Sequence, residues 1–328
     1  MAEKGLTIRP AEENDVLNIQ ALATHALGDQ PVLRSVPFWK WKHKANPFGE
    51  SPVLVMQNAD DLVGLRALMR WNLVKDKNIF TAHRAVDTAT HPDYHGKGIF
   101  TQLTFSLLEQ LNAGDPTVIF NTPNRKSRPG YLKMGWAQSG KTRLKICLSP
   151  SGLVKNHLGS KTKSGYVQEK VILPESLEEL LAAHQNLFSN QVTTACSTDY
   201  LRWRYMEIPG VSYSSHFRES ENGCCWIIWR IKKNFGLVEL RLLEIFFSGS
   251  PSNVREAIRE VISRTRPDVV TVLTDGCGII DECLPTGFIP ASALGLNITV
   301  RKVNDAGLFN DLMNTDNRYL SAGTLELF

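Results

Sequence analysis

The stretch VDTATHPDYHGKGIF, residues 86–100, joins a strand-like run to a helix through a basic turn that contains two glycines. Gly96 and Gly98 let the backbone approach an anion closely, and Lys97 adds positive charge. The helix that begins near Gly98 points its unpaired amide groups and the positive end of its dipole at the same place. The P-loop spacing G-x-x-x-x-G-K-[ST] is absent here. The turn therefore predicts a phosphate site, and a diphosphate ligand is the leading expectation.

A second segment, NRKSRPGYLKMGW (residues 124–136), follows the apolar run TVIFN (residues 117–121) and predicts a short helix that ends at Gly135. Together the two segments resemble motifs A and B of the GCN5-related N-acetyltransferases (GNAT). Motif B reads N-x-x-[AS]-x-x-x-Y-x-x-x-G-[FWY], and the resemblance covers roughly the first 150 residues. The residues in register with the two motifs are Pro92, Tyr94, Gly96, Lys97, Gly98, Asn124, Ser127, Tyr131, Gly135 and Trp136.

The sequence departs from motif A at two positions. His95 stands where the family usually has Arg or Gln, and Phe100 stands where it prefers Gly or Ala. A neutral histidine gives a hydrogen bond but little charge, so the affinity for pyrophosphate is expected to be lower or more dependent on pH than usual. Phe100 is expected to crowd the pantetheine side of the turn. The backbone amides remain, so an acyl-CoA co-substrate is still expected.

Composition limits the class of protein. The chain has 328 residues, which exceeds one comfortable hydrophobic core and favours two domains. Hydrophobic residues make up 42% and charged residues 21%, as in soluble globular proteins. The net charge of +4 is spread along the chain and does not indicate nucleic acid. No signal-peptide layout opens the chain and no apolar run reaches the ~20 residues of a membrane span, so a cytoplasmic protein without membrane contact is expected.

The six cysteines form no C-x-x-C pair and have no histidine at zinc spacing. We expect reduced thiols and no metal.

The two halves of the chain share features. FWKWKH (residues 38–43) returns in character as YLRWRY (residues 200–205), and residues 117–136 match residues 269–288 in length, with the ends M-G-W and T-G-F. This predicts a duplicated fold. Equal-length pairing puts Cys283 opposite Tyr131 and Gly276 opposite Asn124. SGSPS stands where the basic turn would be in the second half, so only the first half is expected to bind cofactor.

The predicted fold class is α/β (α+β), with two tandem GNAT-like domains, each a mixed, mostly antiparallel sheet flanked by helices, and the second degenerate. The expected division is a GNAT domain with the acyl-CoA site at 1–150, a linker at 151–170 and a degenerate GNAT-like domain at 171–328. One strand is expected over residues 137–147, and residues 305–328, which have no strong period, are expected to pack as a tail. The other predicted strands are 6–9, 53–57, 63–73, 79–90, 117–121, 238–247 and 294–303, and the predicted helices are 15–27, 98–112, 125–134, 175–189 and 252–264.

The resemblance implies a site for acyl transfer. The fourth strand, around Thr88, Ala89 and Thr90, would bind the thioester carbonyl and separate from its neighbour to admit pantetheine. Tyr131 would protonate the departing thiolate, or would pack and hydrogen-bond the cofactor sulfur. The predicted cofactor-binding residues are Thr88, Ala89, Thr90, His95, Gly96, Lys97, Gly98, Ile99, Phe100, Asn124, Ser127 and Tyr131.

Two candidates for the base, His83 and Asp87, share one face of the predicted strand, with small side chains at Ala85 and Ala89 beside them. The alternative is an ion pair of Asp87 with Arg84 or Arg66 and a His83 satisfied at a domain contact. For the acceptor, the aromatic and basic patches could stack on a sugar or base and hold phosphates, although paired tryptophans are more often core residues. The predicted substrate-binding residues are Trp39, Trp41, Arg202 and Trp203.

The expected function is an acyl-CoA-dependent N-acyltransferase that uses acetyl-CoA or a short hydroxyacyl-CoA. The twin arrangement and the opening FWKWKHKANPFG (residues 38–49) resemble acyltransferases of bacterial surface-polysaccharide pathways. That resemblance implies a nucleotide-linked amino sugar, such as a dTDP-3-amino-3,6-dideoxyhexose, as the amine acceptor. Two alternatives stay open: a Fem-like transferase that depends on aminoacyl-tRNA, and a noncatalytic CoA-binding module. The oligomeric state is open too, with a homodimer as one arrangement.

Overall fold

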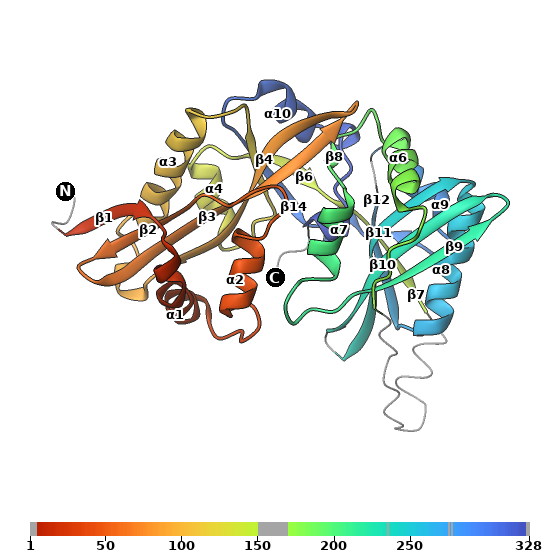
Figure 1. Cartoon of the computed structure of the whole chain (residues 1–328), viewed down its shortest axis with the longest axis horizontal. Helices are drawn as coiled ribbons and strands as arrows, with labels where there is room; N and C mark the ends of the chain where they lie inside the picture. Colours follow the sequence, from red (N-terminus) through yellow and green to blue (C-terminus); the bar gives the residue numbers. More distant parts are fainter. Residues whose placement is uncertain (1–4, 150–169, 235, 275, 277, 326–328) are drawn as a thin grey trace.

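The computed structural model describes residues 5–149, 170–234, 236–274, 276 and 278–325. The expected linker at 151–170 lies almost wholly outside these residues. Two sheets lie side by side, with helices on their faces (Figure 1). Within the described residues, no helix is long and apolar enough to cross a membrane.

The first sheet has the strand order β1-β2-β3-β4-β5-β14-β6, and β8 pairs with β3. The second has the order β13-β7-β12-β11-β10-β9. Only β4–β5 and β11–β12 are parallel among the pairs of named strands in the described residues. The strands of the first sheet are β1 (Leu6–Pro10), β2 (Val53–Asn58), β3 (Asp61–Lys75), β4 (Asn78–Thr90), β5 (Val118–Asn121), β6 (Ala137–Lys141), β8 (Thr193–Thr194) and β14 (Asn297–Lys302). Those of the second are β7 (Arg143–Leu148), β9 (Ser214–Ser220), β10 (Gly223–Asn234), β11 (Leu237–Gly249), β12 (Val269–Thr274) and β13 (Ile289–Pro290).

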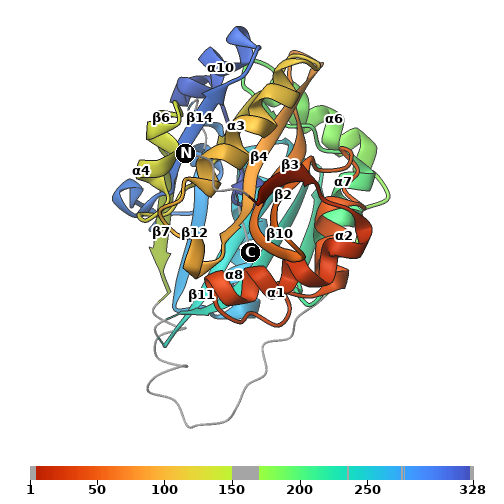
Figure 2. The ribbon, with the colours of Figure 1, turned by 90° about the vertical axis from the view of Figure 1, so that its left-hand side faces the viewer.

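The helices of the first half cover both faces of its sheet, with α3 on one face and α1 and α2 on the other (Figure 2). α3 forms because Ile99, Leu103 and Leu107 recur every four residues and bury one stripe against the sheet. The described helices are α1 (Val16–Leu27), α2 (Val36–His43), α3 (Ile99–Asn112), α4 (Arg128–Lys133), α6 (Leu177–Leu187), α7 (Thr198–Tyr205), α8 (Pro251–Thr265), α9 (Ile279–Cys283), α10 (Ala306–Met313) and α11 (Ala322–Leu325). The predicted fold class, mixed α/β with two mostly antiparallel sheets flanked by helices, is confirmed.

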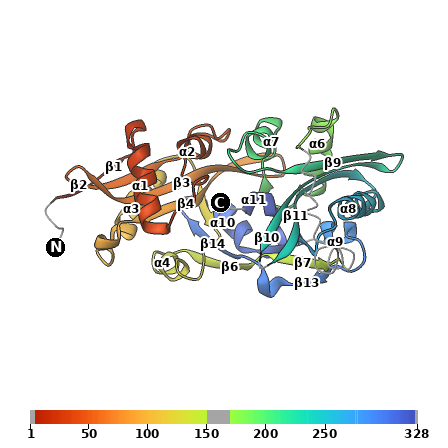
Figure 3. The same ribbon diagram turned by 90° about the horizontal axis from the view of Figure 1, so that it is seen from below.

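One predicted strand is wrong. The single strand expected over 137–147 is two strands in different sheets: β6 ends the first sheet and β7 lies between β12 and β13 in the second. Figure 3 shows β6 and β7 end to end, one in each half. The chain crosses at Thr142, whose amide donates to the Leu296 carbonyl at 2.9 Å, while the Leu296 amide donates to Thr142 Oγ1 at 2.9 Å. Local alternation of side chains does not reveal this change of sheet.

The exchange of strands is mutual. β14, near the end of the chain, inserts between β5 and β6 of the first sheet, where Val300 pairs with Phe120 and Ala137. Each half therefore supplies a strand that its partner half lacks. Gly295 permits the crossing, because a Cβ there would come within 2.3 Å of the Thr142 carbonyl oxygen.

The halves also meet through two tryptophans, one from α2 and one from α7. Trp41 and Trp203 stack with ring centroids 4.7 Å apart. Each indole Nε1 donates to the backbone carbonyl of the other tryptophan, at 2.8 Å in both directions. Both side chains are buried in the largest core cluster, which draws residues from both sheets. Such reciprocal contacts between matching residues are what a duplicated fold would give at its pseudo-two-fold axis.

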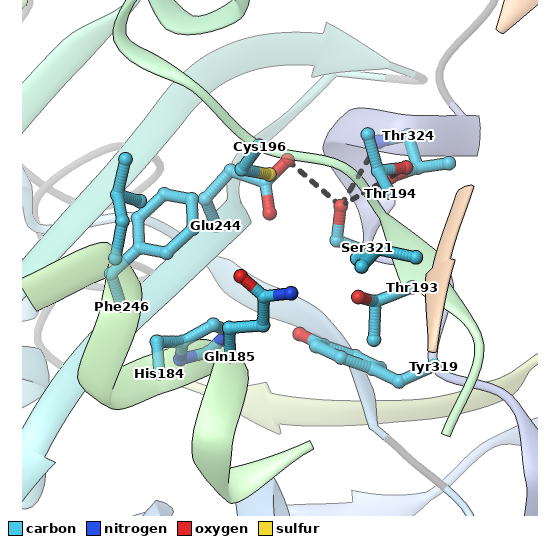
Figure 4. Close-up of a pocket in the computed structure, with 12 residues that line it drawn as sticks. His184, Gln185, Thr193, Thr194, Cys196, Glu244, Phe246, Tyr319, Ser321 and Thr324 are labelled. Atoms are coloured by element: carbon cyan, nitrogen blue, oxygen red, sulfur yellow. Dashed lines mark hydrogen bonds between the residues drawn. The ribbon is translucent and has the colours of Figure 1, made fainter. Parts of the chain in front are cut away.

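The segment expected as a tail is instead part of the core. α10 packs on β14 and β6, and residues 318–325 are all buried. Glu244 of β11 receives a hydrogen bond from Tyr205 Oη at 2.6 Å. It receives a second from Ser321 Oγ at 2.8 Å (Figure 4). Burial raises the pKa of Glu244 to about 7, against the smaller opposing effects of these hydroxyls and of Arg204.

We expect a chain that ends at residue 149 not to fold. Without β14, β5 keeps only its three pairs with β4, and Val118 and Phe120 lose their neighbours on the other edge. Far-UV circular dichroism and thermal melting compare this fragment with the full chain, and co-expression with residues 170–328 should restore the native signal. A cooperative, native-like melt of the fragment alone would contradict the inferred dependence.

We expect Glu244→Gln to change how stability depends on pH. The folded-state pKa of Glu244 is raised to about 7 from 4.5, so its contribution to stability is full below about pH 4.5 and is lost as pH rises through 7. The unfolding free energy of the wild type, minus that of the variant, should fall by about 3 kcal/mol at most over this window.

Urea unfolding of both proteins from pH 4.5 to 8 measures this difference. The variant keeps an acceptor for Tyr205 and Ser321, and the buried histidines cancel in the comparison. A difference that does not vary with pH would show that burial does not hold Glu244 in its neutral form.

Candidate functional site

The turn before α3 has the geometry of an anion site. Gly96 and Gly98 have φ of +79° and +76°, values that favour glycine, and a Cβ on Gly96 would meet no atom within 4 Å. Gly98 is the N-cap of α3 and gives it no side-chain cap. His95 Nε2 donates to the Thr90 carbonyl at 3.1 Å and so ties the turn to the end of β4. The first amides of a 14-residue helix are left for a ligand.

The matching helix of the second half lacks this property. Ser250, the N-cap of α8, accepts a hydrogen bond from the Ser252 amide with its own side chain. Pro251 follows it at the first helical position. The N-terminus of α8 is therefore capped by the chain itself, as the segment SGSPS suggested.

The strand before the turn has a free edge. The β4–β5 ladder pairs Ala82–Arg84 with Val118–Phe120 and goes no further in the described residues. Residues 85–90 of β4 therefore extend beyond the ladder by ~20 Å, at about 3.3 Å per residue. Asp87, with φ +34°, is the extra residue of a bulge opposite Arg66 and Ala67. The structure thus holds open the strand edge of Thr88, Ala89 and Thr90.

Tyr131 of α4 lies over this edge. Its side chain is 5% exposed, and its Oη accepts a hydrogen bond from Arg66 Nη1 at 2.9 Å. The Phe100 ring meets Tyr131 edge-on, with centroids 5.5 Å apart. Arg66 Nη1 also donates to Thr88 Oγ1. The structure therefore brings Tyr131, Phe100 and Thr88 together, with Arg66 as a member that sequence reasoning did not place in the site.

Asp87 faces the opposite side of the sheet and is engaged by two neighbours. Its Oδ2 lies 2.7 Å from Lys42 Nζ and 2.8 Å from His43 Nε2, both from α2. Burial would raise the pKa of Asp87, but Lys42 and His43 outweigh it and hold this pKa well below its usual range. An ionised Asp87 is a weak proton acceptor and a good partner for orienting His43. The ion pair with Arg84 or Arg66 that the sequence left open is not the one formed.

His43 is a candidate that the sequence prediction missed. Because the Asp87 carboxylate accepts only, His43 Nε2 carries the hydrogen of their bond and Nδ1 holds a lone pair. Nδ1 is buried and has no hydrogen-bond partner among the described residues. Burial lowers the pKa of His43, with Asp87 opposing it. The histidine is therefore neutral at pH 7 and able to accept a proton.

His83, the second predicted base, lies elsewhere. It pairs with Arg70 and Ile119, five residues before Thr88 on β4. Its Nδ1 is hydrogen-bonded to Thr117 Oγ1 at 3.0 Å, and burial lowers its pKa to about 4. The structure does not bring His83 to the free edge of β4.

A pocket opens beside Asp87 on the side of α1 and α2. Its walls include Arg34, Trp39, Lys42 and Thr88. Arg34 Nε is buried and has no hydrogen-bond partner in the part of the chain that the structure describes. The pocket thus presents positive charge next to the free edge of β4.

The remaining predicted residues have other roles in the structure. Trp41 and Trp203 are closed off in their mutual stack, and Arg202 is exposed, so of the four predicted acceptor contacts only Trp39 lines this pocket. Asn124 Oδ1 accepts from the Lys126 and Ser127 amides at 2.9 Å, which shapes the entry to α4. Lys97 Nζ lies 4.7 Å from the centre of the Tyr94 ring. In the described ranges, no cluster of three or more His, Cys, Asp or Glu is arranged to hold a metal ion.

One sequence family matches part of the chain. Residues 7–139 match the sequence family described as "Acetyltransferase (GNAT) domain". No curated protein matches the chain.

Solved structures resemble the whole chain at low identity. A GCN5-related N-acetyltransferase from Anabaena variabilis has a TM-score of 0.66 at 15% identity, with 91% of this chain and 73% of that chain covered. One from Kribbella flavida has a TM-score of 0.62 at 11% identity, over 91% and 71%. N-myristoyltransferase from Saccharomyces cerevisiae, solved with bound myristoyl-CoA, has a TM-score of 0.51 at 9% identity, over 100% and 90%. These likenesses concern the fold, and the family match covers residues 7–139, the part of the chain that holds the turn and Tyr131.

Proposed function

We propose that this protein is an acyl-CoA-dependent N-acyltransferase whose site lies in the first half. The observation that carries the proposal is the combination of an uncapped helix N-terminus at Gly98 with the free edge of β4 that leads to it. Phosphate suits the first feature, and an extended pantetheine amide chain suits the second. The GNAT match over the same residues supports this reading.

Each part of the site has a proposed role. The turn Gly96–Gly98 and the first amides of α3 hold the diphosphate, and the backbone of Thr88–Thr90 pairs with pantetheine. Bound acyl-CoA supplies an activated thioester. Tyr131 Oη donates the proton that the departing sulfur needs, and an amide at the β4 bulge polarises the carbonyl. The amine attacks directly, in a ternary complex.

For the base we propose His43 oriented by Asp87, in place of Asp87 itself or His83. A base must have a free lone pair, which a histidine offers only in its neutral form, and His43 Nδ1 meets this condition. Asp87 fixes the tautomer of His43 through the 2.8 Å bond. The division of roles resembles that of other paired carboxylate and imidazole groups.

For the acceptor we propose an amine that carries phosphate, such as a nucleotide-linked amino sugar. Arg34 lines the pocket beside Asp87, and its Nε is buried and has no hydrogen-bond partner among the described residues, whereas the charge of Lys42 is paired with Asp87. Trp39 offers a face on which a ring could stack. Incubating nucleotide amino sugars with acetyl-CoA and short hydroxyacyl-CoAs, and following thiol release, tests this choice of substrates.

We also propose that the two halves arose by duplication and that the second, which follows the linker at 151–170, is catalytically degenerate. The reciprocal bonds of Trp41 and Trp203 support the first point. The self-capped N-terminus of α8 and Cys283 in the place of Tyr131 support the second.

We expect Gly96→Ala to weaken CoA binding about tenfold, which corresponds to about 1.4 kcal/mol. The added Cβ would project into the open space where the diphosphate is proposed to lie. Gly236→Ala is the matched control, since Gly236 also has φ +79° and no atom within 4 Å of a built Cβ, but lies in the second half. Isothermal titration with CoA measures both variants. Equal affinities of the two variants and the wild type would count against the proposed diphosphate site.

We expect Tyr131→Phe to lower kcat by about 10²-fold while the dissociation constant for CoA changes little, because the hydroxyl acts only as the C–S bond breaks. Tyr205→Phe is the control, since it removes a buried hydroxyl bonded to Glu244, away from the site. Steady-state rates at saturating acyl-CoA are measured for both variants and for the wild type. If Tyr131→Phe turns over as fast as the wild type, the acid assignment is wrong.

A further inference from the structure

Arg66 is a buried cation without a carboxylate partner. It lies in the middle of β3 with 0% of its surface exposed, and it forms no ion pair within the described residues. Nη1 donates to Tyr131 Oη at 2.9 Å and to Thr88 Oγ1. Nε and Nη2 are buried and have no hydrogen-bond partner among the residues described. Asp87, the residue before Thr88, is paired with Lys42 and His43.

This arrangement lowers the stability of the fold, so a functional role would explain why it is present. Burying a guanidinium with two unsatisfied nitrogens is unfavourable, and the rings of Phe100 and Tyr131, each 5.3 Å from Arg66 Cζ, offset only part of that cost. Arg318 is a useful contrast. It is also buried, but both of its terminal nitrogens donate to oxygens, among them the Ser139 carbonyl at 2.8 Å. Arg318 therefore suits a structural role, whereas Arg66 has capacity to spare for negative charge.

The second half lost this arginine together with the tyrosine. In the first sheet, Arg66 pairs with Thr88 immediately beside the bulge of β4. In the second sheet, the corresponding pair beside the bulge of β11 is Ile228 and Glu244. Cys283 stands opposite Tyr131 in the matched segments. The second half lacks a counterpart of both Tyr131 and Arg66, which suggests that the two side chains act together.

We propose that Arg66 is a positioning residue that acts through Tyr131, holding the phenolic oxygen in place and stabilising the negative charge that forms on it during acyl transfer. The inference rests on the proposed function and goes beyond it, because the free edge, the turn and Tyr131 would serve an acyltransferase without Arg66. Arg66 has no carboxylate partner in the described structure. We therefore assign its charge to stabilising the negative charge that forms on the Tyr131 oxygen during the reaction.

The amine nitrogen forms a bond to the thioester carbon, and the C–S bond breaks with its electron pair on sulfur. The Tyr131 hydroxyl hydrogen passes to that sulfur, which leaves as a thiol, and the phenolate oxygen keeps its hydrogen bond from Arg66 Nη1. The proton released by the amine goes to the base, and through it or solvent a proton returns to Tyr131. The products are an amide and a free thiol, with no further reagent required.

A double-mutant cycle tests the dependence on Tyr131. With acetyl-CoA and thiol release as the readout, Arg66→Met should lower kcat about 10- to 100-fold, change KM for acetyl-CoA less than about threefold, and be partly rescued by Arg66→Lys. In the Tyr131→Phe background, Arg66→Met should have little further effect. Full activity of Arg66→Met would overturn the inference. So would a double variant in which the decrease in kcat equals the product of the decreases in the two single variants.

Thermal melting separates this role from a structural one. Removing a buried, unpaired charge should leave the melting temperature of Arg66→Met equal to or above that of the wild type. Arg318→Met is the control, because Arg318 is buried and donates through both terminal nitrogens, among other partners to the Ser139 carbonyl at 2.8 Å, so its loss should lower the melting temperature. A destabilised Arg66→Met with unchanged chemistry would assign Arg66 to packing. A wild type that neither binds CoA nor releases thiol would instead refute the proposed function itself.

Discussion

The exchange of β7 and β14 is the constraint on which the rest of the structure depends. β5 has a ladder of only three pairs with β4, and the other edge of β5 is covered by β14 from the end of the chain. The separation of β4 from β5, where pantetheine is proposed to lie, is tolerable because β14 anchors β5 from its far side. The candidate site is made of first-half residues, yet its shape is maintained by the second half.

The two halves share a framework, and we propose that the second half has lost the chemistry of the first. Both contain a parallel strand pair with a short ladder, a bulge on the longer strand and a tryptophan that bonds to its counterpart. The first half adds Gly96, Gly98, Arg66 and Tyr131, to which we assign the binding or stabilisation of negative charge. In the second half the helix caps itself with Ser250, and Glu244 is buried against hydroxyls. We infer that selection on the second half acts on packing.

Much of this could be predicted from local sequence. The turn at Gly96 and Gly98, the helix after it and the position of Tyr131 follow motifs whose geometry is set over a few residues. The change of sheet at Thr142 could not be predicted, because the pairing partners of β6 and β7 lie far away in sequence. In the sequence, Arg66 is one residue of a strand and His43 is part of a basic run. Only the fold shows that Arg66 lies beside Tyr131 and that His43 lies beside Asp87. The roles proposed for Arg66 and His43 depend on neighbours that are distant in sequence.

The position of β14 also has a consequence for synthesis. Asn121 of β5 and Thr299 of β14, which share a hydrogen bond, are 178 residues apart. At ribosomal speeds of 5–20 residues per second, β5 waits roughly 9–36 s for its neighbour to emerge. During that interval the apolar edge of a nascent sheet is uncovered, and chaperones that shield such edges would have their longest opportunity to act. The N-terminal half, although made first, is completed last.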